Sequence, residues 1–183
     1  MTITGELTDL LSVLRRLNAF DAPLAAVVAS SFGAVSLLSL LAELPPFCER
    51  LVLWNPVLDL GDTFLRPSPP WGRRNFGWDR VRDAIRHGGV VEVDGAFRLP
   101  AVLFLEMECY DVEESFRRME LPTIAIHGTA DSFVSFGVTQ RACEASSHAE
   151  LVAVEGSDHG FQRPEDEARA LDATAAFLLR GSA

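Results

Sequence analysis

Three short motifs in this chain carry the residue types that nucleophilic catalysis requires. Ser31 lies in ASSFG, Asp131 in HGTAD and His159 in GSDHG, and each motif follows an apolar, strand-like run. A serine hydroxyl becomes a good nucleophile only when an imidazole takes its proton and an acid holds that imidazole in place. The order serine, acid, histidine therefore predicts a site for acyl transfer.

The residues around the serine favour a sharp turn from a strand into a helix. Ala29 and Gly33 are small, which lets neighbouring backbone and side chains approach closely at such a turn. The backbone N–H of Phe32 is then the predicted oxyanion donor. Ser30 is the weaker candidate nucleophile, because Phe32 occupies the position two residues after it. The alternative for Ser31 is a simple helix cap.

Two aspartates compete for the role of the acid. Asp131 follows the strand-like run 122–127 within a few residues, and Asp59 follows the run 50–54. We favour Asp131, whose carboxylate would accept the imidazole N–H and stabilise the cation formed in catalysis. The alternative is an aspartate that only shapes a surface turn. His127, at the start of the same motif, is predicted to be structural.

Among the four histidines, His159 has the context expected of a catalytic base. Glycines on both sides allow a loop to place its ring over Ser31. The neighbouring Asp158 is predicted to stabilise that loop. His87 and His148 lack such context and are predicted to be surface residues.

The hydrophobic pattern predicts an α/β fold around these motifs. Strands are expected at 24–29, 50–54, 122–127 and 149–154, and helices at 6–19, 33–44, 137–146 and 163–180. This alternation is typical of a parallel sheet with helices on both faces. The run 24–29 is apolar throughout, which predicts a strand buried on both sides. Residues 60–120 interrupt the pattern, with helices expected at 77–87 and 100–118, and are interpreted as a cap or lid.

Composition limits the classes of function. A chain of 183 residues with 48% hydrophobic and 23% charged residues predicts one globular domain, 1–183. A net charge of −10 argues against nucleic acid and anionic membranes as partners. No apolar stretch is long enough for a membrane span, and no residue spacing indicates a metal site or a cofactor. Three cysteines without CxxC spacing and no visible signal peptide favour reduced thiols and a cytoplasmic protein.

The segments VVASSFG, LVLWNPVLD, FRLPAVLFLEMECYDV, LPTIAIHGTADSFV and VAVEGSDHGF together resemble the α/β-hydrolase superfamily. The resemblance is strongest to its serine aminopeptidase-like and cinnamoyl-esterase-like branch, and it covers most of the chain. It implies the C-terminal portion of a three-layer α/β-hydrolase fold, with a parallel sheet of about four strands. It also implies an esterase or thioesterase that acts through Ser31, His159 and Asp131 on a small to medium, apolar acyl group.

Two other functions stay open. The first is a non-catalytic binding or interaction module, or an inactive fragment of a hydrolase. The second is a serine aminopeptidase, in which Glu106, Glu108 or Asp111 would bind the amine of the substrate.

Four aromatic residues of the cap are candidates for contact with an ester substrate, since small-molecule pockets are mostly apolar. They are Trp71, Phe76, Trp78 and Phe104. The alternative is that these rings hold the cap to the body of the domain.

Only 30 residues precede Ser31, whereas the family places several strands and a second oxyanion donor before its nucleophile. The strand at 24–29 is therefore expected at an open, apolar edge of the sheet. Three explanations follow: the chain is a fragment, a second copy or another chain covers the edge, or the protein binds without turnover. The edge and the apolar face of the helix at 6–19 predict a homo-oligomer if no further segment covers them.

Overall fold

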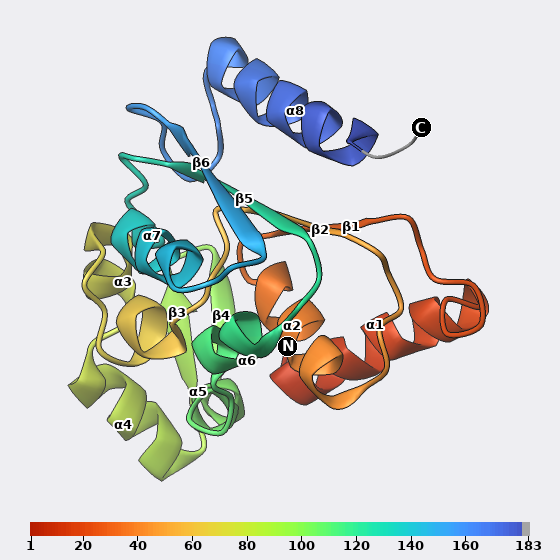
Figure 1. Ribbon diagram of the computed structural model, residues 1–183. Helices are drawn as coiled ribbons and strands as arrows, with labels where there is room; N and C mark the ends of the chain where they lie inside the picture. Colours follow the sequence, from red (N-terminus) through yellow and green to blue (C-terminus); the bar gives the residue numbers. More distant parts are fainter. Residues whose placement is uncertain (181–183) are drawn as a thin grey trace.

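Four parallel strands form the central sheet of the computed structural model, which describes residues 1–180 (Figure 1). Their order is β1 (Val27–Ser30), β2 (Leu51–Trp54), β5 (Thr123–Gly128) and β6 (Ala149–Val154). The predicted fold class is thereby confirmed. Because the strands are parallel, the loops after their carboxyl ends meet along one edge of the sheet.

Helices cover both faces of this sheet. On one face lie α1 (Ile3–Arg16), α2 (Gly33–Glu43), α6 (Val112–Arg118) and α7 (Phe136–Glu144), and on the other lies α8 (Pro164–Leu179) (Figure 1). Helix α1 begins three residues before the expected start, because the Thr2 hydroxyl caps it by accepting the Gly5 N–H at 3.0 Å. None of the helices within residues 1–180 has the length and apolarity that a membrane span requires.

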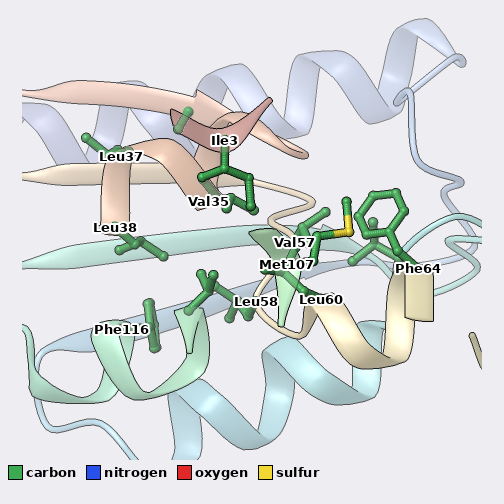
Figure 2. Packing of buried hydrophobic residues seen from close by; sticks show 14 of the residues in the cluster. Ile3, Val35, Leu37, Leu38, Val57, Leu58, Leu60, Phe64, Met107 and Phe116 are labelled. Atoms are coloured by element: carbon green, nitrogen blue, oxygen red, sulfur yellow. The ribbon is translucent and has the colours of Figure 1, made fainter. Parts of the chain in front are cut away.

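Two hydrophobic cores follow from the alternation of side chains along the strands. Leu51 and Leu53 of β2 face α2 and join the larger core, part of which Figure 2 shows around Leu37, Leu38 and Phe116. The smaller core lies between the sheet and α8. Its buried members are Val52, Ile124, Ile126, Val154, Phe161, Ala170 and Phe177.

The prediction that the strand at 24–29 is buried on both faces was wrong. The strand begins at Val27, and Leu24 makes only an isolated bridge to Cys48. Ala29 is buried, but Val28 is 53% exposed, because β1 is the outermost strand and α8 packs over β5 and β6. Coverage of this edge by a second copy remains a prediction.

The segment 60–120 holds more elements than the two expected helices. They are a π-helical turn η1 (Gly61–Leu65), α3 (Pro70–Asn75), α4 (Trp78–His87), β3 (Val90–Val93), β4 (Phe97–Pro100), α5 (Ala101–Met107) and α6. The antiparallel hairpin β3–β4 was not predicted, and Asp94 and Gly95 at its turn both have positive φ. The expected helix 100–118 is divided because the Asp111 carboxylate accepts the Glu114 N–H and starts α6 anew.

Candidate active site

Ser31 lies in a strained turn between β1 and α2. Its φ of 53° is left-handed, a conformation that costs a residue other than glycine about 1–3 kcal/mol and recurs at functional sites. Backbone hydrogen bonds hold the turn: the Ser31 N–H donates to the Trp54 carbonyl at 2.9 Å, and the Ser31 carbonyl accepts the Val57 N–H at 3.1 Å. The turn leaves Ser31 and Phe32 at the start of α2, where the first N–H groups have no acceptor within the helix.

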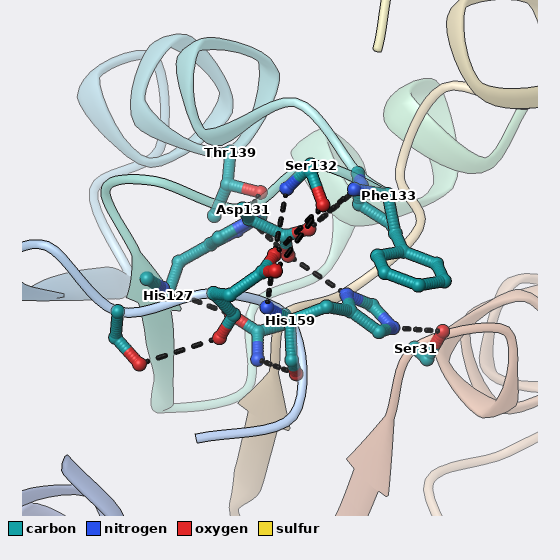
Figure 3. A network of polar contacts seen from close by, with 12 residues as sticks. Ser31, His127, Asp131, Ser132, Phe133, Thr139 and His159 are labelled. Atoms are coloured by element: carbon teal, nitrogen blue, oxygen red, sulfur yellow. Dashed lines mark hydrogen bonds and ion pairs between the residues drawn. The ribbon is translucent and has the colours of Figure 1, made fainter. Parts of the chain in front are cut away.

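Two hydrogen bonds join the three predicted residues (Figure 3). His159 Nε2 lies 2.9 Å from Ser31 Oγ, and His159 Nδ1 lies 2.8 Å from Asp131 Oδ2. The structure therefore brings Asp131, and not Asp59, to the imidazole. Asp59 instead accepts the backbone N–H of Asp62 at 2.8 Å.

The surroundings of Asp131 keep its carboxylate charged. Burial acts to raise its pKa, but contacts with His127 and His159 and the backbone N–H of Val134 outweigh burial and lower the pKa to about 2. Oδ1 accepts the N–H groups of Phe133 and Val134 at 2.8 and 3.0 Å. Both carboxylate oxygens therefore have hydrogen-bond partners, which fix the position of the acid and favour its charged form.

His127 supports this acid from inside the fold. Its side chain is fully buried, with Nδ1 2.9 Å from Thr139 Oγ1 and Nε2 3.1 Å from Asp131 Oδ2 (Figure 3). His127 and His159 therefore approach the same carboxylate oxygen. His127 lies where a structural residue was expected, and its contact with the acid is an addition to that expectation.

Asn55 is a buried bridge that the sequence analysis did not identify. Its Nδ2 donates to the His159 carbonyl at 2.6 Å, and its Oδ1 accepts the Gly128 N–H at 2.9 Å. The residue is 1% exposed and has a φ of 43°, a conformation that asparagine tolerates better than most residues. Asn55 thereby ties the ends of β2 and β5 to the loop of the histidine. The pair Asn-Pro directly after a strand was the available signal.

Asp158 joins the loop of the acid to the loop of the base. Its Oδ1 accepts the Ser132 N–H at 2.9 Å and the His159 N–H at 2.8 Å. Burial acts to raise the pKa of this carboxyl, and the two backbone N–H groups outweigh it and lower the pKa. Asp158 does not hydrogen-bond the imidazole itself.

The imidazole of His159 is the last of three stacked rings. The rings of Phe133 and His159 lie 5.0 Å apart at 20°, and those of Trp71 and Phe133 lie 5.0 Å apart at 26°. Two hydrogen bonds fix the position of Trp71. Its indole Nε1 donates to Asp94 of the hairpin at 2.7 Å, and its backbone N–H donates to the Ser132 carbonyl at 3.0 Å. The β3–β4 turn thus supports the candidate base through two rings.

Ser31 and His159 open onto a cavity of about 440 Å³, a volume typical of small-molecule sites. Most of its wall is apolar. The lining residues are Met1, Ser31, Phe32, Val57, Thr63, Phe64, Trp71, Phe97, Arg98, Leu99, Leu103, Met107, Phe133, Val134 and His159. This arrangement can bind an apolar group next to the serine hydroxyl.

Solved structures with the same architecture include esterases and a lipase. An esterase domain from Rhodothermus marinus has a TM-score of 0.67 and 22% identity, over 93% of this chain and 67% of that chain. Est1E from Butyrivibrio proteoclasticus with bound ferulic acid has a TM-score of 0.74 and 17% identity, over 97% and 68%. The monoacylglycerol lipase from Paleococcus ferrophilus has a TM-score of 0.69 and 14% identity, over 97% and 76%.

The chain has the α/β-hydrolase fold. No family model matches its sequence, and no curated protein matches it. The chain spans 67–76% of the length of these solved structures. At such low identities the likeness defines the fold, and the function of this α/β-hydrolase fold has to be argued from its site.

Of the four aromatic residues predicted to contact substrate, only Trp71 lines the cavity. Phe76 and Phe104 are 1% and 0% exposed and pack against each other behind the wall, with ring centroids 5.7 Å apart. Trp78 is 46% exposed on α4 and away from the lining. The cavity beside Ser31 therefore does not include these three residues, and the rings of Phe76 and Phe104 pack in the core of the segment. Rings of Phe32, Phe64, Phe97 and Phe133 line the cavity instead.

The two buried cysteines do not offer a competing nucleophile. Burial raises the pKa of the Cys48 and Cys143 thiols to about 11, so both stay protonated at neutral pH. Within residues 1–180 no group of three His, Cys, Asp or Glu side chains is placed to hold a metal ion.

Proposed function

We propose that this chain is a serine hydrolase that cleaves a carboxylic ester or thioester of a small to medium, largely apolar acyl group. The observation that carries the proposal is the pair of hydrogen bonds from Ser31 Oγ to His159 and from His159 to the buried carboxylate of Asp131. The strained serine turn and the apolar cavity beside it support the same reading.

The geometry supports a two-step acyl transfer. Ser31 Oγ attacks the acyl carbonyl carbon while His159 Nε2 takes the hydroxyl proton, and Asp131 stabilises the imidazolium. Collapse of the tetrahedral intermediate breaks the bond to the alcohol or thiol, which leaves with the proton from His159. Water then attacks the acyl-serine, gives its proton to His159, and releases the carboxylic acid and the free Ser31 hydroxyl.

The negative charge of the intermediate needs hydrogen-bond donors close to Ser31. The Phe32 N–H at the start of α2 is our candidate, and the helix dipole adds to its effect. One such donor is typically worth about 2.7–4 kcal/mol in the transition state.

The wall of the cavity favours an ester over the amine-bearing substrate of an aminopeptidase. Its lining includes no aspartate or glutamate that could bind a substrate ammonium group. Glu106 accepts the Ile3 N–H at 2.6 Å, while Glu108 and Asp111 line a different cavity. The three acids therefore lie away from Ser31, and no cofactor is needed for the proposed reaction.

A panel of p-nitrophenyl esters of increasing acyl length tests the proposal. We expect turnover of short to medium chains by the wild type and a loss of about 10⁴-fold or more in kcat for Ser31→Ala. Ser30→Ala is the matched control, because the exposed neighbouring serine should be dispensable. A folded wild type without turnover of any ester would favour the non-catalytic binding module instead.

A further inference from the structure

Thr63 is a buried polar residue on the wall of the cavity that contains Ser31. It is 2% exposed, it lies in the π-helical turn η1, and its backbone N–H donates to the Asp59 carbonyl at 3.1 Å. Turns of this kind are rare and often mark functional sites. Gly72 of α3 lies close against its backbone, since a Cβ at Gly72 would be 2.7 Å from the Thr63 carbonyl oxygen.

The hydroxyl of Thr63 has no protein partner. Among the described residues, Ser39 Oγ and Asp62 Oδ2 are enclosed side-chain atoms with neither a hydrogen bond nor an ion pair. Thr63 Oγ1 makes no hydrogen bond in residues 1–180 either, yet it is not enclosed, so it retains access to open space. Thr63 lines the cavity beside Ser31, which is the open space available to this hydroxyl.

The other polar side chains of the wall differ from Thr63 in their partners or their exposure. Ser31 and His159 hydrogen-bond to each other. Arg98 pairs in register with Glu92 on the exposed face of the hairpin, whereas Leu99 on the opposite face is buried. Apart from the Ser31–His159 pair and the exposed Arg98, the wall is apolar, and Thr63 adds a buried residue whose hydroxyl has no protein partner. A valine of the same shape would fill this position without an unpaired polar atom.

We propose that Thr63 hydrogen-bonds a hydroxyl group on an acyl chain that is otherwise apolar, and so determines which acyl groups the site prefers. The proposal rests on the proposed hydrolase function. A threonine hydroxyl both donates and accepts a hydrogen bond, as a substrate hydroxyl also does, so the two groups satisfy each other. The stacked and aliphatic residues around it would bind the remaining carbon chain.

The test compares ethyl octanoate with its hydroxylated derivatives, which carry the hydroxyl beside the carboxyl group, one carbon further, or at the far end. For the wild type we expect a higher kcat/KM, by about three- to tenfold, for one of these isomers over octanoate. Thr63→Val should remove this preference, so that the ratio of kcat/KM values between the preferred isomer and octanoate falls to about one. Thr63→Ser should keep the preference, and Thr8→Val on the exposed face of α1 should change nothing.

Two results would overturn the proposal: no hydroxylated isomer is preferred by the wild type, or Thr63→Val keeps the preference. Thermal unfolding of Thr63→Val distinguishes a role in substrate binding from a structural role. Loss of an unpaired hydroxyl should not lower Tm, whereas loss of a hydrogen bond within the fold would lower it. Binding of octanamide and the hydroxyoctanamides, followed by NMR, does not need turnover. A hydroxyamide preference that Thr63→Val removes would support Thr63 even if the wild type cleaves no ester, and equal affinities would refute it.

Discussion

The bridge made by Asn55 allows a prediction whose size follows from the structure. Asn55→Gly removes the donor to the His159 carbonyl and the acceptor of the Gly128 N–H. Each buried backbone group left without a partner costs about 1–3 kcal/mol, so the loss is about 2–6 kcal/mol in the free energy of unfolding. Glycine adopts the positive φ of this position without strain, so the loss measures the side chain and not the backbone.

The same substitution should also reduce catalysis, because the His159 backbone loses its tether to the sheet. A displacement of about 1 Å at a reacting group can cost about 10²-fold in rate, and we expect a fall in kcat of that order with a smaller change in KM. Urea unfolding followed by circular dichroism and turnover of p-nitrophenyl butyrate measure the two effects. The melting temperature should fall by about 2–4 °C for each kcal/mol lost.

Asn18→Gly is the matched control for this experiment. Asn18 also has a positive φ, of 55°, but it is exposed and its side chain makes no hydrogen bond within residues 1–180. Its replacement should change the free energy of unfolding by less than about 0.5 kcal/mol. If Asn55→Gly unfolds like Asn18→Gly and retains its kcat, the bridge does not position the base and this reasoning is wrong.

Two further predictions concern the surroundings of the base and the acid. Phe133→Leu should lower kcat with little change in KM, because no stacked ring then holds His159. Phe133→Tyr keeps the stacked ring and should retain the kcat of the wild type. Equal kcat values for the wild type and both variants would contradict a positioning role. Asp131 has its pKa lowered from 3.8 to about 2, so its ionisation stabilises the fold above about pH 4, and this contribution is lost as the pH falls towards 2. Urea unfolding between pH 2 and 6 should therefore show a steeper loss of stability for the wild type than for Asp131→Asn, and parallel curves would contradict the shift.

The sequence was sufficient to predict which residues meet at the candidate site. Ser31, Asp131 and His159 follow three different parallel strands, and the loops after such strands lie at one edge of the sheet. Asn55 could not be predicted in the same way, because its bond to Gly128 joins residues 73 positions apart and depends on the register of β2 and β5.

The segment 60–120 was harder to predict because its elements are short. Strands of four residues carry too little alternation to identify, although Asp94 and Gly95 between them form a known hairpin signal. Composition also could not distinguish the aromatic rings of the cavity from those of the core. Trp71 lines the cavity and Phe76 lies behind it, a difference set by packing among neighbouring rings.

The most direct test of the central claim is the site of reaction with a fluorophosphonate, which forms a covalent bond with an activated serine. Intact mass and peptide mapping should show one adduct on Ser31 of the wild type, no adduct on Ser31→Ala, and strongly slowed labelling of His159→Gln. Ser30→Ala should label like the wild type. A folded wild type that stays unlabelled, or an adduct on another residue, would contradict a nucleophile built from Ser31, His159 and Asp131.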